Sequence, residues 1–129
     1  MRKMLLSSVA ISAVAMALVP SVGHAGFTWS GATCVKNSGG DGYCEGNFNG
    51  FRTSSDPNAY YYFFETETGN QQFGANLNGG WYYCSVPSTS PLMSIWRDAM
   101  NNRGWFRISW NASSQCTGLT LYNSSAYSY

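Results

Sequence analysis

The most regular alternation of side chains in this chain covers residues 59–66. A two-residue period over that length predicts a β-strand whose side chains point in turn to its two faces. One face carries Tyr60, Tyr62 and Phe64, and the other carries Tyr61, Phe63 and Glu65. Because rings occupy both faces, some of them must point away from the core.

The neighbouring stretches also predict β structure. Phe48 and Phe51 mark a short strand interrupted by glycine, and residues 54–58 form a turn. Residues 68–70, Thr-Gly-Asn, predict a hairpin turn. The strand after it has one buried face, made of Phe73, Ala75 and Leu77. Residues 78–80 interrupt this pattern, and residues 81–86 form a further strand or the second half of a long, bulged one.

A single helix is predicted from residue 90 onward. Ser90 followed by Pro91 is an N-cap with proline at the first helical position, and Gly104 is the expected C-terminal stop. The apolar residues Leu92, Ile95, Trp96 and Ala99 recur at helical spacing.

Two strands follow the helix. Alternation puts Phe106, Ile108 and Trp110 on the core face of the first, and Trp105, Arg107 and Ser109 on its other face. Leu119 and Leu121 are the buried side of the last strand. The expected fold is therefore mainly β with one α-helix, in the order β-β-β-α-β-β. An OB-fold has this order, so we expect a small antiparallel β barrel or a strongly twisted sheet.

The first 25 residues have the pattern of a secretory signal peptide. Arg2 and Lys3 precede an uncharged apolar run, and Gly-His-Ala ends at residue 25 in the manner of a signal peptidase site. The run is shorter than the roughly 20 apolar residues of a membrane span. We expect cleavage after Ala25, leaving one mature domain of residues 26–129 in the periplasm or outside the cell, with no membrane span.

The composition of the mature chain limits the classes of partner that it can bind. It contains every Trp, Tyr and Phe of the protein, and five Lys and Arg against six Asp and Glu, a net charge of −1. Such a balance provides no basic surface for nucleic acid, so no nucleic-acid partner is expected.

The four cysteines lie in the exported part, where disulfides are the default. Three pairings are possible. We predict Cys34–Cys44, which closes a Gly-rich loop, and Cys84–Cys116, which brackets the helix. A tetrathiolate metal site is disfavoured because the spacing contains no C-x-x-C.

The mature domain has few groups for catalysis. The only histidine, His24, precedes the expected cleavage site, so the commonest general base and metal ligand is absent from the mature sequence. Glu65 and Glu67, two apart on one strand face, are the one carboxylate pair suited to glycoside hydrolysis, although such a pair before a turn is more often a solvated strand end. Asp41 lacks the companion ligands of a calcium loop. We predict no enzyme activity, metal or cofactor.

Binding is the function that the remaining residues suit. Tyr and Trp offer flat apolar faces with a polar handle and little conformational entropy to lose. The candidate binding residues are Trp105, Arg107, Tyr61, Tyr62 and Trp81. Tyr61 and Tyr62 lie on opposite faces of one strand, so only the one that faces outward is expected to bind. Such residues suit a glycan or a protein partner. A secreted inhibitor or surface structural protein therefore stays open as an alternative.

Residues 81–122 resemble the small receptor-binding subunits of pertussis-like toxins. The resemblance lies in the order of WYYCSV, the helix SPLMSIWRDAMNNRG, the strand WFRISW and then CTGLTLY. In those subunits a strand with a cysteine, a helix, a strand, and a second cysteine before the final strand follow in the same order. The resemblance implies glycan binding by a ring of five subunits, and therefore a homo-oligomer. It matches no sugar-contacting residue to a position in this chain.

Overall fold

The structure of the protein, a computed structural model, describes residues 29–127. The predicted signal peptide, residues 1–25, and the expected start of the mature chain at residue 26 lie outside the described residues. In chain order the elements are β1 (Ala32–Lys36), β2 (Gly42–Asn47), α1 (Phe48–Arg52), β3 (Tyr60–Glu65), β4 (Gln71–Leu77), β5 (Gly80–Ser85), the 3₁₀ helix η1 (Pro91–Ile95), α2 (Trp96–Asn101), β6 (Trp105–Trp110), β7 (Cys116–Tyr122) and the 3₁₀ turn η2 (Ser125–Tyr127).

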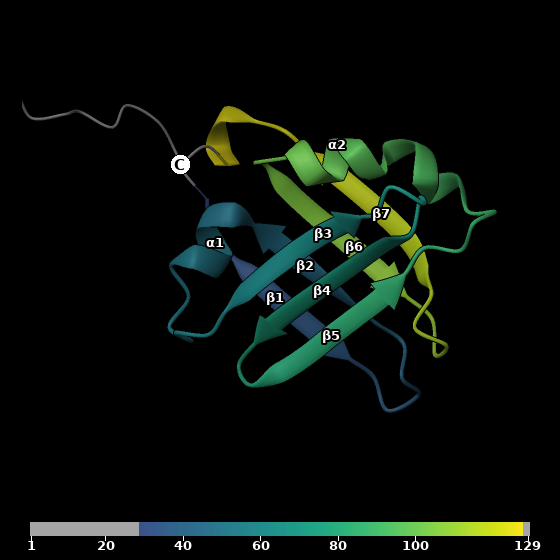
Figure 1. Cartoon of the computed structure of the whole chain (residues 1–129). Helices are drawn as coiled ribbons and strands as arrows, with labels where there is room; N and C mark the ends of the chain where they lie inside the picture. Colours follow the sequence, from purple (N-terminus) through teal and green to yellow (C-terminus); the bar gives the residue numbers. More distant parts are fainter. Residues whose placement is uncertain (1–28, 128–129) are drawn as a thin grey trace, which may run out of the picture.

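The strands form two antiparallel sheets (Figure 1). One has the order β1-β2-β6-β7 and the other the order β3-β4-β5. Their strands cross at a steep angle in Figure 1, as in orthogonal sheet packing. The mainly β, antiparallel class is confirmed, but the strands within residues 29–127 do not close into a barrel. A parallel bridge between Ser85 and Gln115 joins the sheets at one corner.

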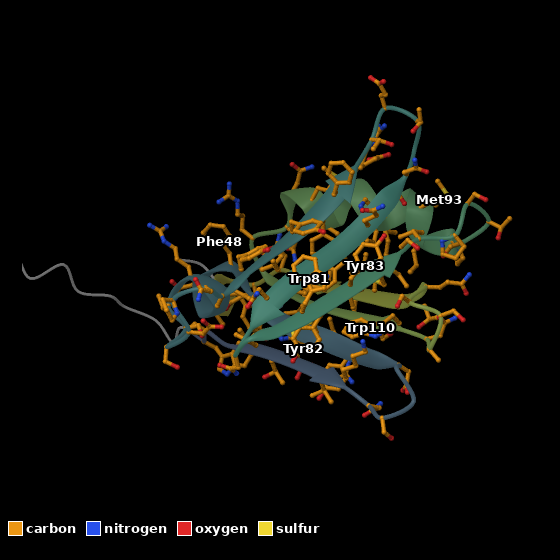
Figure 2. The ribbon with its side chains drawn as sticks, turned by 60° about the horizontal axis from the view of Figure 1, so that its bottom comes forward. Phe48, Trp81, Tyr82, Tyr83, Met93 and Trp110 are labelled. Carbon is orange, nitrogen blue, oxygen red and sulfur yellow. A yellow bond between two sulfur atoms is a disulfide. The ribbon has the colours of Figure 1, made fainter. Side chains whose placement is uncertain are left out.

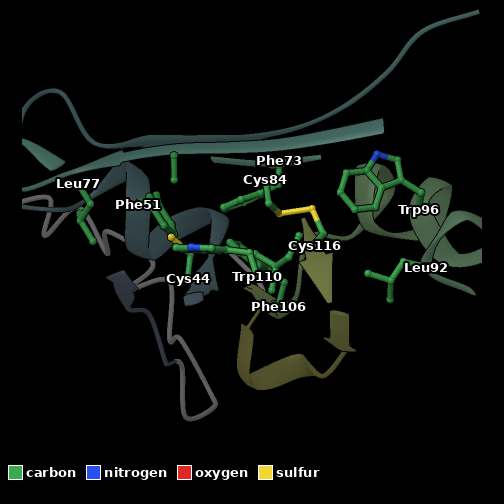
Figure 3. Close-up of a cluster of buried hydrophobic side chains, with 12 residues drawn as sticks. Cys44, Phe51, Phe73, Leu77, Cys84, Leu92, Trp96, Phe106, Trp110 and Cys116 are labelled. Carbon is green, nitrogen blue, oxygen red and sulfur yellow. A yellow bond between two sulfur atoms is a disulfide. The ribbon is translucent and has the colours of Figure 1, made fainter. Parts of the chain in front are cut away.

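The hydrophobic core lies between the two sheets, and α2 covers one end of it (Figure 3). The rings of Phe73 on β4 and Phe106 on β6 meet across it, with centroids 5.8 Å apart. Trp96 of α2 is fully buried, and its indole N–H donates to the carbonyl of Phe64 at 3.0 Å. The predicted core faces are confirmed, since these residues are buried: Phe73, Ala75, Leu77, Phe106, Ile108 and Trp110. Leu119 and Leu121 are partly buried against the same core.

Both disulfides join the predicted partners. Cys34–Cys44 links β1 to β2 within one sheet. Cys84–Cys116 links β5 to β7, and therefore one sheet to the other, across the core (Figure 3). The Gly-rich segment expected as a loop is largely a hairpin, because Cys34 pairs directly with Cys44 in the register of β1 and β2.

The region of Phe48 and Phe51 is the short helix α1 and not the predicted strand. Asn47 causes the difference, because its side-chain oxygen caps the helix by accepting from the backbone N–H of Gly50 at 2.8 Å. The same oxygen accepts from the N–H of Gly31 at 3.2 Å, and the Asn47 amide donates to the carbonyl of Trp29 at 2.9 Å. These long-range bonds do not appear in a local pattern.

The predicted strand over residues 59–66 is β3, and β5 is a strand of its own. Asn78 and Gly79 have φ of 53° and 75°, the two positive values of a type I′ turn, which folds β5 back beside β4. β3 ends at Glu65, so Glu67 lies in the following turn. The prediction that the two carboxylates share a strand face is therefore wrong.

The helix starts as predicted, since the hydroxyl of Ser90 accepts from the N–H of Leu92 at 3.2 Å. Its first part is 3₁₀, and α2 ends at Asn101, before the predicted stop at Gly104. Asn102 is extended, and its side chain bonds to the N–H of Gly104 and the carbonyl of Trp105. Position 104 requires glycine for a reason other than ending the helix, because a Cβ there would overlap the carbonyl oxygen of Tyr122.

Candidate binding surface

The outer face of the three-stranded sheet collects exposed aromatic side chains. Paired residues on antiparallel strands point to the same side of a sheet. The strand register therefore sets out three rows across β3, β4 and β5: Tyr60, Asn76 and Trp81; Tyr62, Gly74 and Tyr83; Phe64, Gln72 and Ser85. The alternate residues, including Phe63, Phe73 and Cys84, belong to the core. We call the surface formed by the three rows the aromatic face.

The rings of the aromatic face are exposed and lie against one another. Three of them are about half exposed to solvent: Trp81 at 50%, Tyr60 at 48% and Phe64 at 45%. The ring of Trp81 lies 6.2 Å from that of Tyr60 and 6.3 Å from that of Tyr62. Strands two places apart are separated by about 9.6 Å, so these rings lean toward each other over β4. In Figure 2, Trp81 and Tyr83 lie over the ribbon of this sheet, and Tyr82 lies toward Trp110.

Gly74, in the centre of the aromatic face, makes room for Tyr62. The two residues are direct partners across β3 and β4. A Cβ at Gly74 would overlap the end of the Tyr62 ring. The ring therefore lies across the glycine and covers the middle strand, which leaves a flat surface where a side chain would otherwise project.

Polar groups of the aromatic face are amides, hydroxyls and the indole N–H of Trp81, and none of its nine residues is charged. Asn76 and Gln72 place amides on the middle strand, between the rings. The Oδ1 atom of Asn76 is buried and accepts no hydrogen bond from the described residues. Burial raises the pKa of Tyr62, and the neighbouring phenols of Tyr83 and Tyr60 raise it further. Apart from the buried Oδ1 of Asn76, these groups can exchange hydrogen bonds with a ligand that lies on the rings.

Two predicted binding residues, Tyr62 and Trp81, lie on the aromatic face, and Tyr61 points the opposite way. The Tyr61 ring packs 4.6 Å from that of Phe106 and 4.9 Å from that of Phe51. Burial raises the pKa of Tyr61, and the guanidinium of Arg103 lowers it by less. Tyr61 lines two hollows of about 230 and 250 Å³, both of which Phe48 also lines. Of the two tyrosines, Tyr62 is the one that faces outward.

The other two predicted residues, Trp105 and Arg107, lie on the outer side of the four-stranded sheet, away from the aromatic face. Arg107 bonds to the carboxylate of Glu45 at 3.0 Å, and its guanidinium lies 4.0 Å from the centre of the Tyr43 ring. Its charge is thus paired within the sheet. Trp105 is half-buried and pairs with Tyr122 in the register. The structure therefore divides the five candidates among two opposite surfaces and the interior.

The carboxylates do not assemble into a reactive pair. Glu65 lies 3.6 Å from Arg97 and accepts a hydrogen bond from Gln71 at 3.4 Å. Glu65 and Glu67 line a hollow of about 510 Å³ beside the turn after β3, together with Arg97. Within residues 29–127, no three His, Cys, Asp or Glu side chains are grouped so as to hold a metal ion.

Three rings of the aromatic face, Tyr60, Phe64 and Tyr83, were not among the predicted binding residues. The alternation of residues 59–66 already grouped Tyr60 and Phe64 with Tyr62. It did not say which face of β3 is buried. Tyr83 joins them only through the register of β5 on β4, where it lies in the row of Gly74.

No family model, no curated protein and no solved structure gives a significant match to this chain. None of the helices described has the length and hydropathy required to cross a bilayer.

Proposed function

We propose that this protein is an exported, non-enzymatic binding module that recognises a glycan on the aromatic face. The observation that carries the proposal is the surface of β3, β4 and β5. There, exposed rings from the two outer strands lean over a middle strand that supplies amides and a glycine.

The chemistry of the aromatic face suits a neutral sugar. A pyranose ring has apolar C–H faces that pack on aromatic rings, and hydroxyls around its rim that need donors and acceptors. Asn76, Gln72 and the tyrosine hydroxyls provide both. The face has no charge to pair with an acidic or basic protein surface, whereas protein interfaces commonly gain orientation from such pairs.

The scaffold supports a role outside the cytoplasm. Two disulfides hold the sheets, and such bonds persist in oxidising compartments. Together with the signal peptide predicted over residues 1–25, they support export to the periplasm or the cell exterior. A rigid sheet also limits the entropy lost on binding, because the rings are already in place.

An OB-like relationship with toxin receptor-binding subunits is part of the same proposal. The order β3-β4-β5, then α2, then β6-β7 is the β-β-β-α-β-β order expected of an OB-fold, and the parallel bridge Ser85–Gln115 links the two sheets. In this chain β6 pairs with β2 of the N-terminal hairpin, which leaves the barrel open. A ring of five subunits is also implied, and sedimentation of the mature protein tests it.

A glycan array probed with the oxidised mature protein, residues 26–129, tests the proposed function. We expect binding by the parent, loss of binding with Trp81→Ala, and parent-like binding with Tyr122→Ala. Tyr122 is a matched control, since it is 56% exposed on the opposite sheet. Binding by both variants would move the site away from the aromatic face. An array without any hit, together with a protein partner lost by Trp81→Ala, would favour the protein-interface alternative.

A further inference from the structure

The aromatic face differs in shape from a pocket for a single sugar. Trp81 and Tyr83 do not line the hollows beside α1, beside α2 or at the turn after β3. Tyr60 and Tyr62 each line one of these hollows, whose other residues lie outside the aromatic face. The Tyr62 ring covers Gly74, so the centre of the face has no depression of its own. A ligand on this face must lie on the surface, and it can contact several rings at once.

The rings extend in two directions over the sheet. Along β3, Tyr60, Tyr62 and Phe64 are two residues apart, a spacing of about 6.8 Å between their backbones. Across the sheet, Trp81 leans to within 6.3 Å of both Tyr60 and Tyr62. The apolar surface is thus continuous over several ring widths, more than one pyranose can cover.

From this shape we infer that the ligand is an extended, neutral polysaccharide whose sugars are joined through equatorial bonds at C1 and C4, and that it is bound along its length. Such chains are flat ribbons with apolar C–H faces above and below and hydroxyls along both edges. A ribbon covers successive rings with its face and presents its edges to Asn76 and Gln72. An axially linked chain is helical and cannot keep consecutive sugars flat on one plane of rings. The inference rests on the proposed function and names the class of glycan.

Calorimetric titration with three oligosaccharide series tests the inference. The β-1,4-linked glucose and β-1,4-linked N-acetylglucosamine series represent neutral ribbons, and the α-1,4-linked glucose series is the helical control. From monosaccharide to hexasaccharide, we expect no measurable binding at first and then an affinity that rises about tenfold or more beyond the disaccharide, in at least one β-linked series. Trp81→Ala should abolish this rise, and Tyr122→Ala should leave it unchanged.

The outcomes separate this inference from the proposed function. If a monosaccharide binds as tightly as its hexasaccharide, the protein does not bind the chain along its length, and the inference is wrong. The inference is also wrong if the α-linked series binds as well as the β-linked ones. If neither β-linked series binds while the array hits only glycans that are not β-1,4-linked ribbons, the inference is wrong and the proposed function stands. If neither the array nor any series binds, both are wrong.

Discussion

Trp81 and Trp110 show how the position of one ring decides what it contributes. Trp110 is 4% exposed, packs 6.2 Å from Tyr82, and donates its indole N–H to the carbonyl of Gly40 at 3.2 Å. Trp81 is half exposed, and its ring lies beside those of Tyr60 and Tyr62 on the aromatic face. The first ring contributes to stability and the second is free to contribute to binding.

We therefore predict opposite effects for the two substitutions. Trp110→Ala should lower the free energy of unfolding by about 3 to 5 kcal/mol, because it opens a cavity in the core, whereas Trp81→Ala should cost about 1 kcal/mol or less. An anchor ring commonly carries about 2 kcal/mol or more of binding energy, so Trp81→Ala should lose ligand while staying folded. Denaturant titration ranks the two. A larger loss for Trp81→Ala would mean that the sheet has its faces reversed.

Gly74 tests the aromatic face without removing any ring. Gly74→Ala should displace Tyr62 and lower stability by about 1 to 3 kcal/mol through overpacking. In a Tyr62→Ala background the same change should cost much less, because the overlapping ring is gone. A double-mutant cycle in denaturant measures this coupling. Equal costs in the two backgrounds would show that the Tyr62 ring does not lie over Gly74.

Among the elements, the two disulfides constrain chain segments of different length. Cys84 and Cys116 are 32 residues apart, and their bond ties β5 to β7 across the core. Cys34 and Cys44 are 10 residues apart within one hairpin. Closing the longer segment restricts the unfolded chain more.

We predict that the double variant Cys84→Ala, Cys116→Ala is the less stable of the two double variants. The chain-entropy relation gives losses of about 4 kcal/mol for that bond and about 3 kcal/mol for Cys34–Cys44. Thermal melts of both double variants provide the comparison, with peptide mapping to confirm the remaining bond. A lower melting temperature for the hairpin variant would reverse the ranking and assign the main constraint to β1 and β2.

At the scale of the whole molecule, the two disulfides together contribute about 7 kcal/mol to the free energy of unfolding by the same chain-entropy relation. Domains of this size are commonly stable by only about 5 to 15 kcal/mol. We predict that residues 26–129 made in a reducing cytoplasm are largely unfolded and that oxidation restores the fold. Near-ultraviolet circular dichroism, which reports the packed rings, measures both states. An unchanged spectrum after full reduction would show that the core is sufficient without the disulfides.

Some properties of this protein follow from the sequence alone. The alternation in residues 59–66 and 105–110 correctly grouped side chains by face, because a strand has a period of two whatever it packs against. The cysteine pairs and the Ser90 cap were also correct. They depend on chain spacing and on chemistry within a few residues, which a sequence contains.

Other properties were decided by the tertiary structure. β3 has rings on both faces, so only its packing on β6 could turn Tyr61 inward and Tyr62 outward. The Asn47 side chain that caps α1 also bonds to Gly31, sixteen residues away. Trp105 and Trp81 were both candidate binding residues, yet they lie on opposite sides of the protein because β5 and β6 belong to different sheets. Which face of a strand is buried, and which strands are neighbours, depends on contacts between distant segments, and no local pattern contains them.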